Sequence, residues 1–160
     1  MHAQSLFSAV IRTKGGVSWC THRGVPPILI DNLRMARHVC DASLQAFCIL
    51  PDRVLLLVRP GKEGLRAFLE TFKTASVRDA QVVAGLLMAD QKLFRGWLSE
   101  DEIQEIPPDD AVLAMVAIEE APLRFGFVHK KEKWQWGSWW YGSSFGGPTP
   151  RSAGDKRREA

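Results

Sequence analysis

The chain has 160 residues, a net charge of +3 and an apolar fraction of 46%, which are ordinary values for a soluble globular protein. This length predicts one domain with a core of its own. No apolar run is long enough to span a bilayer, and the N-terminus lacks the charged and apolar regions of a signal peptide. We therefore expect a cytoplasmic protein without membrane contact, in which the three cysteines are buried thiols.

Charge is distributed unevenly along the chain. The window from Gly96 to Leu123 holds eight acidic residues and no Lys or Arg, so the remainder carries 21 basic against ten acidic residues. A basic body with one acidic patch fits a polyanionic partner that approaches from one side. An ordinary solvated surface with chance clustering is the alternative, and charge alone does not decide between the two.

The N-terminal half predicts a strand, a helix and a hairpin. Apolar and polar side chains alternate over Ser5–Thr13, which indicates a strand that ends at a Gly-Gly turn. Pro27–Asp41 has apolar residues at helical spacing. Leu44–Leu50 and Arg53–Arg59 are apolar runs joined by a Pro-Asp turn, typical of two paired strands. Because the second run is apolar on both faces, we expect a central strand covered on both sides.

The C-terminal half predicts a further helix, strand, acidic loop and helix, in that order: Gly61–Met88, Lys92–Ser99, Glu100–Asp110 and a segment capped by Asp109 or Asp110 that runs to about Ala121. The resulting order of elements predicts an α+β, ferredoxin-like (RRM-like) βαββαβ sandwich, in which helices cover one face of an antiparallel sheet. Residues 1–141 form the expected domain. Residues 142–160 are rich in Gly, Ser and Pro and carry four basic residues, which predicts a disordered basic tail.

The hairpin carries a resemblance to a known family. Residues 51–58, Pro-Asp-Arg-Val-Leu-Leu-Leu-Val, are similar to the Pro-(Asn/Asp)-His-Val-His-Leu-Leu-Val signature of the IS200-type and REP-associated tyrosine transposases. Residues 117–128 resemble that family's Tyr-Ile-x-Asn-Asn-Pro-Val-Arg-Ala-Gly-Leu-Val, and shorter matches occur at Phe72-Lys73 and Trp134–Trp139. The resemblance spans roughly Phe7 to Tyr141. It implies the family's ferredoxin-like fold and DNA as the partner.

The chemistry of that family needs four side chains that this sequence lacks at the matching positions. In the family, two His hold a divalent metal, a Tyr attacks the scissile phosphate, and a polar residue one helical turn after that Tyr completes the metal shell. The matching positions here hold Arg53, Leu55, Ala117 and Ala121. The resemblance therefore implies a degenerate, catalytically inactive member with no metal and no cofactor.

The sequence also contains cationic and aromatic side chains of the kinds that bind nucleic acid. Arginine binds phosphate through two parallel hydrogen bonds, lysine binds it as a point charge, and tryptophan stacks on exposed bases. The candidate contacts are Arg12, Lys14, Arg53, Lys73, Arg124, Lys130, Lys131, Lys133, Trp139 and Trp140. The alternative for Arg53 and Lys73 is a solvated charge, and the alternative for the tryptophans is an aromatic core that seals the edge of the sheet.

The sequence thus predicts a catalytically inactive, repurposed transposase-like protein that binds single-stranded or hairpin DNA. The alternative is a protein–protein adaptor that uses the acidic loop or the tryptophans and binds no nucleic acid. An enzyme with new chemistry has little support, because no Ser-His-Asp, Cys-His or metal-binding pattern is evident. We expect a monomer, with a homodimer as the alternative.

Overall fold

The computed structural model describes residues 5–87, 96–130 and 134–141, with side chains for all of these except residues 84–87. Within these ranges, four strands form one antiparallel sheet in the order β2-β3-β1-β4: β1 (Leu6–Arg12), β2 (Ser43–Leu50), β3 (Arg53–Arg59) and β4 (Glu102–Ile106). The helices are α1 (Val25–Val39), α2 (Leu65–Leu87), α3 (Ala111–Glu119), α4 (Ala121–Arg124) and α5 (Ser138–Tyr141). Short 3-10 turns at Lys14–Gly16 and Pro108–Asp110 precede α1 and α3.

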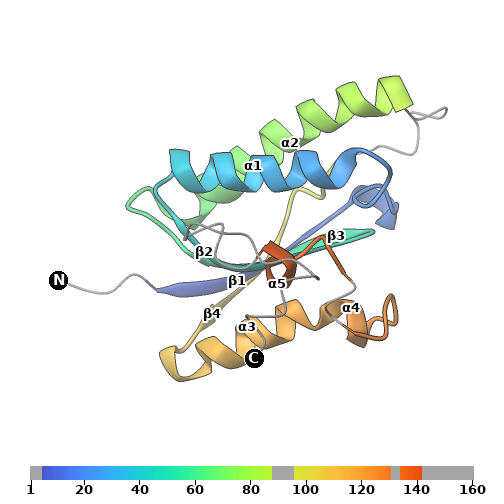
Figure 1. Cartoon of the computed structure of the whole chain (residues 1–160). Helices are drawn as coiled ribbons and strands as arrows, with labels where there is room; N and C mark the ends of the chain where they lie inside the picture. Colours follow the sequence, from blue (N-terminus) through green and yellow to red (C-terminus); the bar gives the residue numbers. More distant parts are fainter. Residues whose placement is uncertain (1–4, 88–95, 131–133, 142–160) are drawn as a thin grey trace.

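The α+β fold class is confirmed, but helices cover both faces of the sheet rather than one. The pair α1 and α2 lies over one face, and α3 lies over the other (Figure 1). Val54, Leu56 and Val58 of β3 belong to the buried cluster beneath α1 and α2, whereas Leu55 and Leu57 belong to the cluster beneath α3. Because each buried Leu or Val contributes about 1.5–3 kcal/mol, a strand that is apolar on both faces requires a cover on both. The uniform pattern of β3 predicted this second cover.

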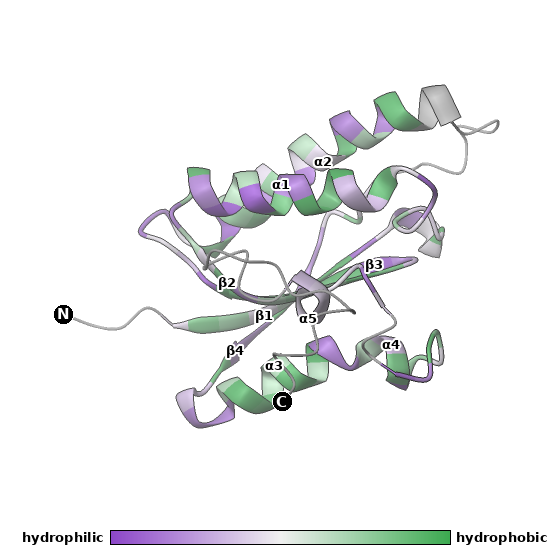
Figure 2. Ribbon diagram, viewed as in Figure 1, coloured by the Kyte–Doolittle hydropathy of each residue, from purple (hydrophilic) through white to green (hydrophobic). Residues whose placement is uncertain are grey.

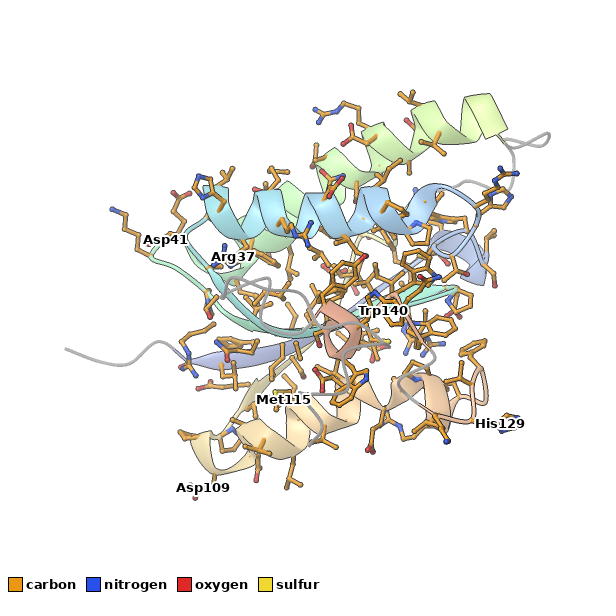
Figure 3. The ribbon with its side chains drawn as sticks, viewed as in Figure 1. Arg37, Asp41, Asp109, Met115, His129 and Trp140 are labelled. Atoms are coloured by element: carbon orange, nitrogen blue, oxygen red, sulfur yellow. The ribbon has the colours of Figure 1, made fainter. Side chains whose placement is uncertain are left out.

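The two helical layers differ in hydropathy. Figure 2 shows hydrophilic and hydrophobic residues interspersed along α1, whereas α3 is hydrophobic over most of its length. Ile118 of α3 is buried against the sheet, while Val112 and Leu113 are 67% and 69% exposed. Figure 3 labels Met115 between α3 and the sheet, where it packs on the second cluster. Thus α3 both completes the core and presents apolar side chains outward.

The prediction of an acidic loop at Glu100–Asp110 is wrong in part, because residues 102–106 form the edge strand β4. Its side chains are largely exposed, and an edge strand tolerates charged residues because its outer side faces water. The strand expected at Lys92–Ser99 lies half outside the described residues, and its described part makes only an isolated bridge between Trp97 and Thr13. Asp110 occupies the position before α3, but its side chain makes no capping hydrogen bond.

Three further predictions concern the cysteines, the C-terminal tail and the absence of a membrane span. Cys20, Cys40 and Cys48 are buried free thiols, as expected. The predicted tail, residues 142–160, lies outside the described residues. Among the described helices, none combines the length and the apolar character needed to cross a membrane.

Candidate nucleic-acid interface

Three of the four positions that match the family's catalytic residues lie where β3 packs against α3 and the start of α4, and the fourth, Arg53, lines another pocket. Leu55 and Ala117 line one pocket of about 280 Å³. Ala121 is fully buried and belongs to the same apolar cluster as Leu55. Arg53 begins β3 two residues before Leu55, on the same face of the strand. The rest of the pocket wall is mainly apolar: Ala9, Val10, Leu56, Ile106, Ala114 and Ile118, with Ser8 and Arg124 as polar members.

This donor set does not fit a divalent cation. An isobutyl group and two methyl groups offer no lone pairs, and a guanidinium carries a positive charge of its own. Across residues 5–87, 96–130 and 134–141, no three His, Cys, Asp or Glu side chains are grouped so that they could hold a metal ion. The metal that the family resemblance implies therefore has no matching ligands in this pocket.

Arg53 is held by two contacts, one with a carboxylate and one with an aromatic ring. Its Nε and Nη2 donate to the two carboxylate oxygens of Asp52 at 2.9 and 3.1 Å. Its guanidinium carbon lies 5.2 Å from the centre of the Phe125 ring. The hydrogen bond from Arg53 lowers the pKa of Asp52 below its ordinary value, so this carboxylate stays ionised near neutral pH. The ion pair orients the guanidinium and reduces the positive charge at this point.

Three further candidate cations lie near the same end of the sheet. Arg12 pairs directly with Arg53 in the β1–β3 register, and its Nε donates to Glu102 Oε2 at 2.7 Å. Lys14 follows two residues later and is exposed. Arg124 donates from Nη1 to the Ala117 carbonyl oxygen at 3.0 Å, and its guanidinium carbon lies 5.8 Å from the Phe125 ring centre. Phe125 is thus flanked by Arg53 and Arg124.

Comparison with solved structures identifies this architecture. A REP-associated tyrosine transposase bound to a REP hairpin aligns with 86% of this chain and 78% of its own, at a TM-score of 0.67 and 13% identity. A protein of Deinococcus radiodurans R1, provisionally described as a transposase, aligns with 75% of this chain and 92% of its own, at a TM-score of 0.57 and 20% identity. The fold of the chain is similar to that of these two proteins. No protein-family model matches the sequence, and no curated protein does.

The resemblance inferred from the two sequence motifs is therefore confirmed at the level of fold. The structure separates the candidate nucleic-acid contacts into groups. Arg12, Lys14, Arg53 and Arg124 belong to the end of the sheet described above. Lys130 is exposed beyond α4, next to His129, which points away from the body of the molecule (Figure 3). Lys131 and Lys133 lie outside the described residues.

Lys73 stands apart from this group. Its side chain on α2 is buried, and its Nζ lies 3.1 Å from Asp101 Oδ1 and 3.4 Å from the Ser99 carbonyl oxygen. A buried and paired ammonium offers little charge to an external phosphate. Neither sequence interpretation anticipated this ion pair, since both placed Lys73 on the surface.

Trp134 and Trp136 close the β2 edge of the sheet. Trp134 donates from Nε1 to the Ile49 carbonyl oxygen at 2.9 Å, and the Trp136 carbonyl accepts from Ile49 N–H at 2.7 Å. Trp134 packs on the cluster beneath α3 and Trp136 on the cluster beneath α1, which favours the edge-sealing interpretation for both. Trp139 and Trp140 are half-buried in α5, and Figure 3 labels Trp140 beside that helix.

Two aromatic residues were not singled out from the sequence. Phe125 and Phe127 are 49% and 46% exposed, and both line a pocket of about 240 Å³ with Arg53 and Asp52. A signal was present, because the matching family motif has Ala and Leu at these two positions. An aromatic ring in place of a smaller side chain, beside a retained Arg, could have marked them.

Proposed function

We propose that this protein is a transposase-like DNA-binding protein that does not cleave DNA, and that it binds single-stranded or hairpin DNA. The observation that carries the proposal is the retained fold together with the side chains between β3 and α3. Leu55, Ala117 and Ala121 have no group that can attack a phosphate, move a proton or hold a metal. Arg53 can bind a phosphate but cannot take the place of a metal-ligating imidazole.

Binding is supported by charge and by the likeness to a DNA complex. Arg12, Lys14, Arg53 and Arg124 gather near one end of the sheet, and Lys130 adds an exposed cation further along the chain. Cations of this kind supply the salt-dependent part of nucleic-acid affinity. The REP-associated transposase with a similar fold is itself bound to a REP hairpin. A hairpin offers unpaired bases as well as backbone phosphates.

The test is a binding panel with a cleavage readout. Fluorescently labelled single-stranded, hairpin and duplex DNA are titrated at about 50 and 200 mM salt, with and without Mg²⁺ or Mn²⁺. We expect single-stranded or hairpin DNA to bind more tightly than duplex, weaker binding at the higher salt, and intact DNA throughout. Absence of binding at low salt refutes DNA binding, whereas metal-dependent cleavage refutes inactivity. Light scattering on the same samples tests the expected monomer.

A second candidate function is a protein–protein adaptor. The observation in its favour is the exposed apolar pair Val112 and Leu113 on α3, which follows the exposed acids Asp109 and Asp110. Large exposed apolar side chains beside charged ones are common at protein interfaces. Three results together would favour the adaptor. The protein binds no DNA, it forms a complex with another protein that nuclease does not disrupt, and the variant Val112→Glu/Leu113→Glu loses that complex.

A further inference from the structure

Phe125 and Phe127 form an exposed aromatic pair in the segment that follows α4. About half of each side chain is accessible, although burial of a phenylalanine normally contributes about 1.5–3 kcal/mol to folding. Both rings line the same pocket, together with Ser18, Leu50, Pro51, Asp52 and Arg53. An apolar surface that stays exposed within a charged surround is a feature of binding sites.

The backbone beneath these rings is firmly held. The N–H groups of Phe125, Gly126 and Phe127 donate to the carbonyls of Ala121, Leu123 and Pro122 at 2.9, 3.0 and 2.8 Å. Gly126 has a φ of +78°, a left-handed conformation that glycine adopts without strain. The turn thereby carries two phenylalanines, one on each side of the glycine, on a backbone fixed by main-chain hydrogen bonds. Side chains presented in this way need little ordering when a ligand binds.

Each ring is also supported by a neighbour. Arg53 and Arg124 flank Phe125 at 5.2 and 5.8 Å from its centre. Phe127 lies 5.6 Å from the ring of Trp134, which is anchored to the Ile49 carbonyl oxygen. Guanidinium groups against aromatic rings occur at sites that stack nucleic-acid bases. The arrangement therefore combines flat apolar surfaces with adjacent positive charge.

The size and charge of the pocket indicate which part of a nucleic acid it would receive. Its volume of about 240 Å³ is below the ~300–1,000 Å³ of drug-sized sites and suits a fragment with one or two rings. The carboxylate of Asp52 lines the pocket and pairs with Arg53, so a phosphate inside it would meet a negative charge. A nucleobase has no formal charge and has two flat faces.

We propose that Phe125 and Phe127 form a stacking site for one unpaired nucleobase of a DNA strand, with the flanking phosphates near Arg124. This inference rests on the proposed DNA-binding function and adds to it residues and a mode of recognition. Base stacking on aromatic side chains tolerates every base, because each has a π-face. It also requires an unpaired base, so the site would favour single-stranded segments or hairpin loops over duplex.

The experiment compares ring variants by fluorescence anisotropy with labelled (dT)15 and with the same strand carrying abasic sites. The variants are Phe125→Ala, Phe127→Ala and Phe125→Leu/Phe127→Leu, which keeps apolar side chains without aromatic faces. Val112→Ala/Leu113→Ala serves as the control, because both side chains are large, apolar and exposed on α3. Thermal melts select variants that fold like the parent.

We expect each Phe→Ala change to weaken (dT)15 binding by roughly five- to 150-fold, the range for loss of one stacked base. The Leu double variant should weaken it as well, while the control binds like the parent and the salt dependence is unchanged. The parent should also bind the abasic strand more weakly than (dT)15. Full affinity of the Leu double variant for (dT)15 would overturn the stacking site but leave DNA binding intact. Failure of the parent to bind (dT)15 would overturn the stacking site, and failure to bind hairpin DNA as well would overturn the proposed DNA binding.

Discussion

The ammonium of Lys73 lies 3.1 and 3.2 Å from the two carboxylate oxygens of Asp101, and both side chains are about 90% buried, with exposed fractions of 10% and 9%. This ion pair joins the middle of α2 to the segment that leads into β4. From the sequence alone, Lys73 cannot be told apart from a surface lysine. In the structure, it is part of the packing between a helix and the edge of the sheet. Its effect should appear in stability rather than in DNA affinity.

Lys73→Met should lower the free energy of unfolding by about 3 kcal/mol, because it leaves the Asp101 carboxylate buried without its partner. Urea denaturation measures this loss, and DNA titration should show an unchanged Kd. The double variant Lys73→Met/Asp101→Leu should recover much of the stability, since replacing a buried pair with apolar side chains is often neutral. A single variant that keeps its stability and loses DNA affinity would place Lys73 in the interface instead.

Lys130→Gln should change DNA binding without changing stability. Lys130 is exposed, and each phosphate contact on a single strand contributes about 0.7 to the slope of log K against log salt. We therefore expect the slope to decrease by about 0.7 relative to the parent, measured by anisotropy over a salt series. The folded Lys73→Met/Asp101→Leu variant is the matched control and should keep the parental slope. An unchanged slope in Lys130→Gln would remove Lys130 from the interface.

Asp52→Asn should make the stability of the protein depend less on pH in the acid range. Bonding to Arg53 lowers the pKa of Asp52 from 3.8, so the ionised carboxylate stabilises the folded state. This contribution is fully present above the unfolded pKa and is lost as the pH falls through the lower folded pKa. Thermal melts from pH 7 to about pH 2 should show a smaller acid-induced fall in Tm for the variant than for the parent. An equal fall in both proteins would show that the pair contributes nothing measurable.

Trp134→Phe should destabilise the sheet edge while retaining an aromatic ring. The change removes the donor to the Ile49 carbonyl, and loss of one such hydrogen bond costs about 1–2 kcal/mol. Chemical denaturation followed by circular dichroism measures the difference. Gln135→Ala, at a neighbouring exposed residue, should stay within about 0.5 kcal/mol of the parent. Equal stabilities for the two variants would argue against the edge-sealing role.

Local sequence was sufficient for the hairpin and for the residues at the positions that match the family's catalytic motif. The Pro-Asp turn and the apolar runs predicted both strands to within one residue, because turn chemistry and a period of two are properties of adjacent residues. The residues at Arg53, Leu55 and Ala117 could also be read directly, since a motif has fixed spacing along the chain. That Leu55 and Ala117 line one pocket then followed from the fold.

Long-range packing decided the features that local sequence did not predict. Whether Lys73 meets solvent or Asp101 depends on how α2 lies against a segment 28 residues away, and no local pattern encodes that distance. The same holds for β4, which is a strand because β1 offers it hydrogen-bonding partners, and for the exposure of Phe125 and Phe127, which depends on what the folded chain leaves uncovered. By itself, the sequence determined the strands of the hairpin and the side chains at the positions that match the family's catalytic motif. Only the tertiary structure decided which charges are free and which rings face water, because burial and pairing are set by contacts between distant segments.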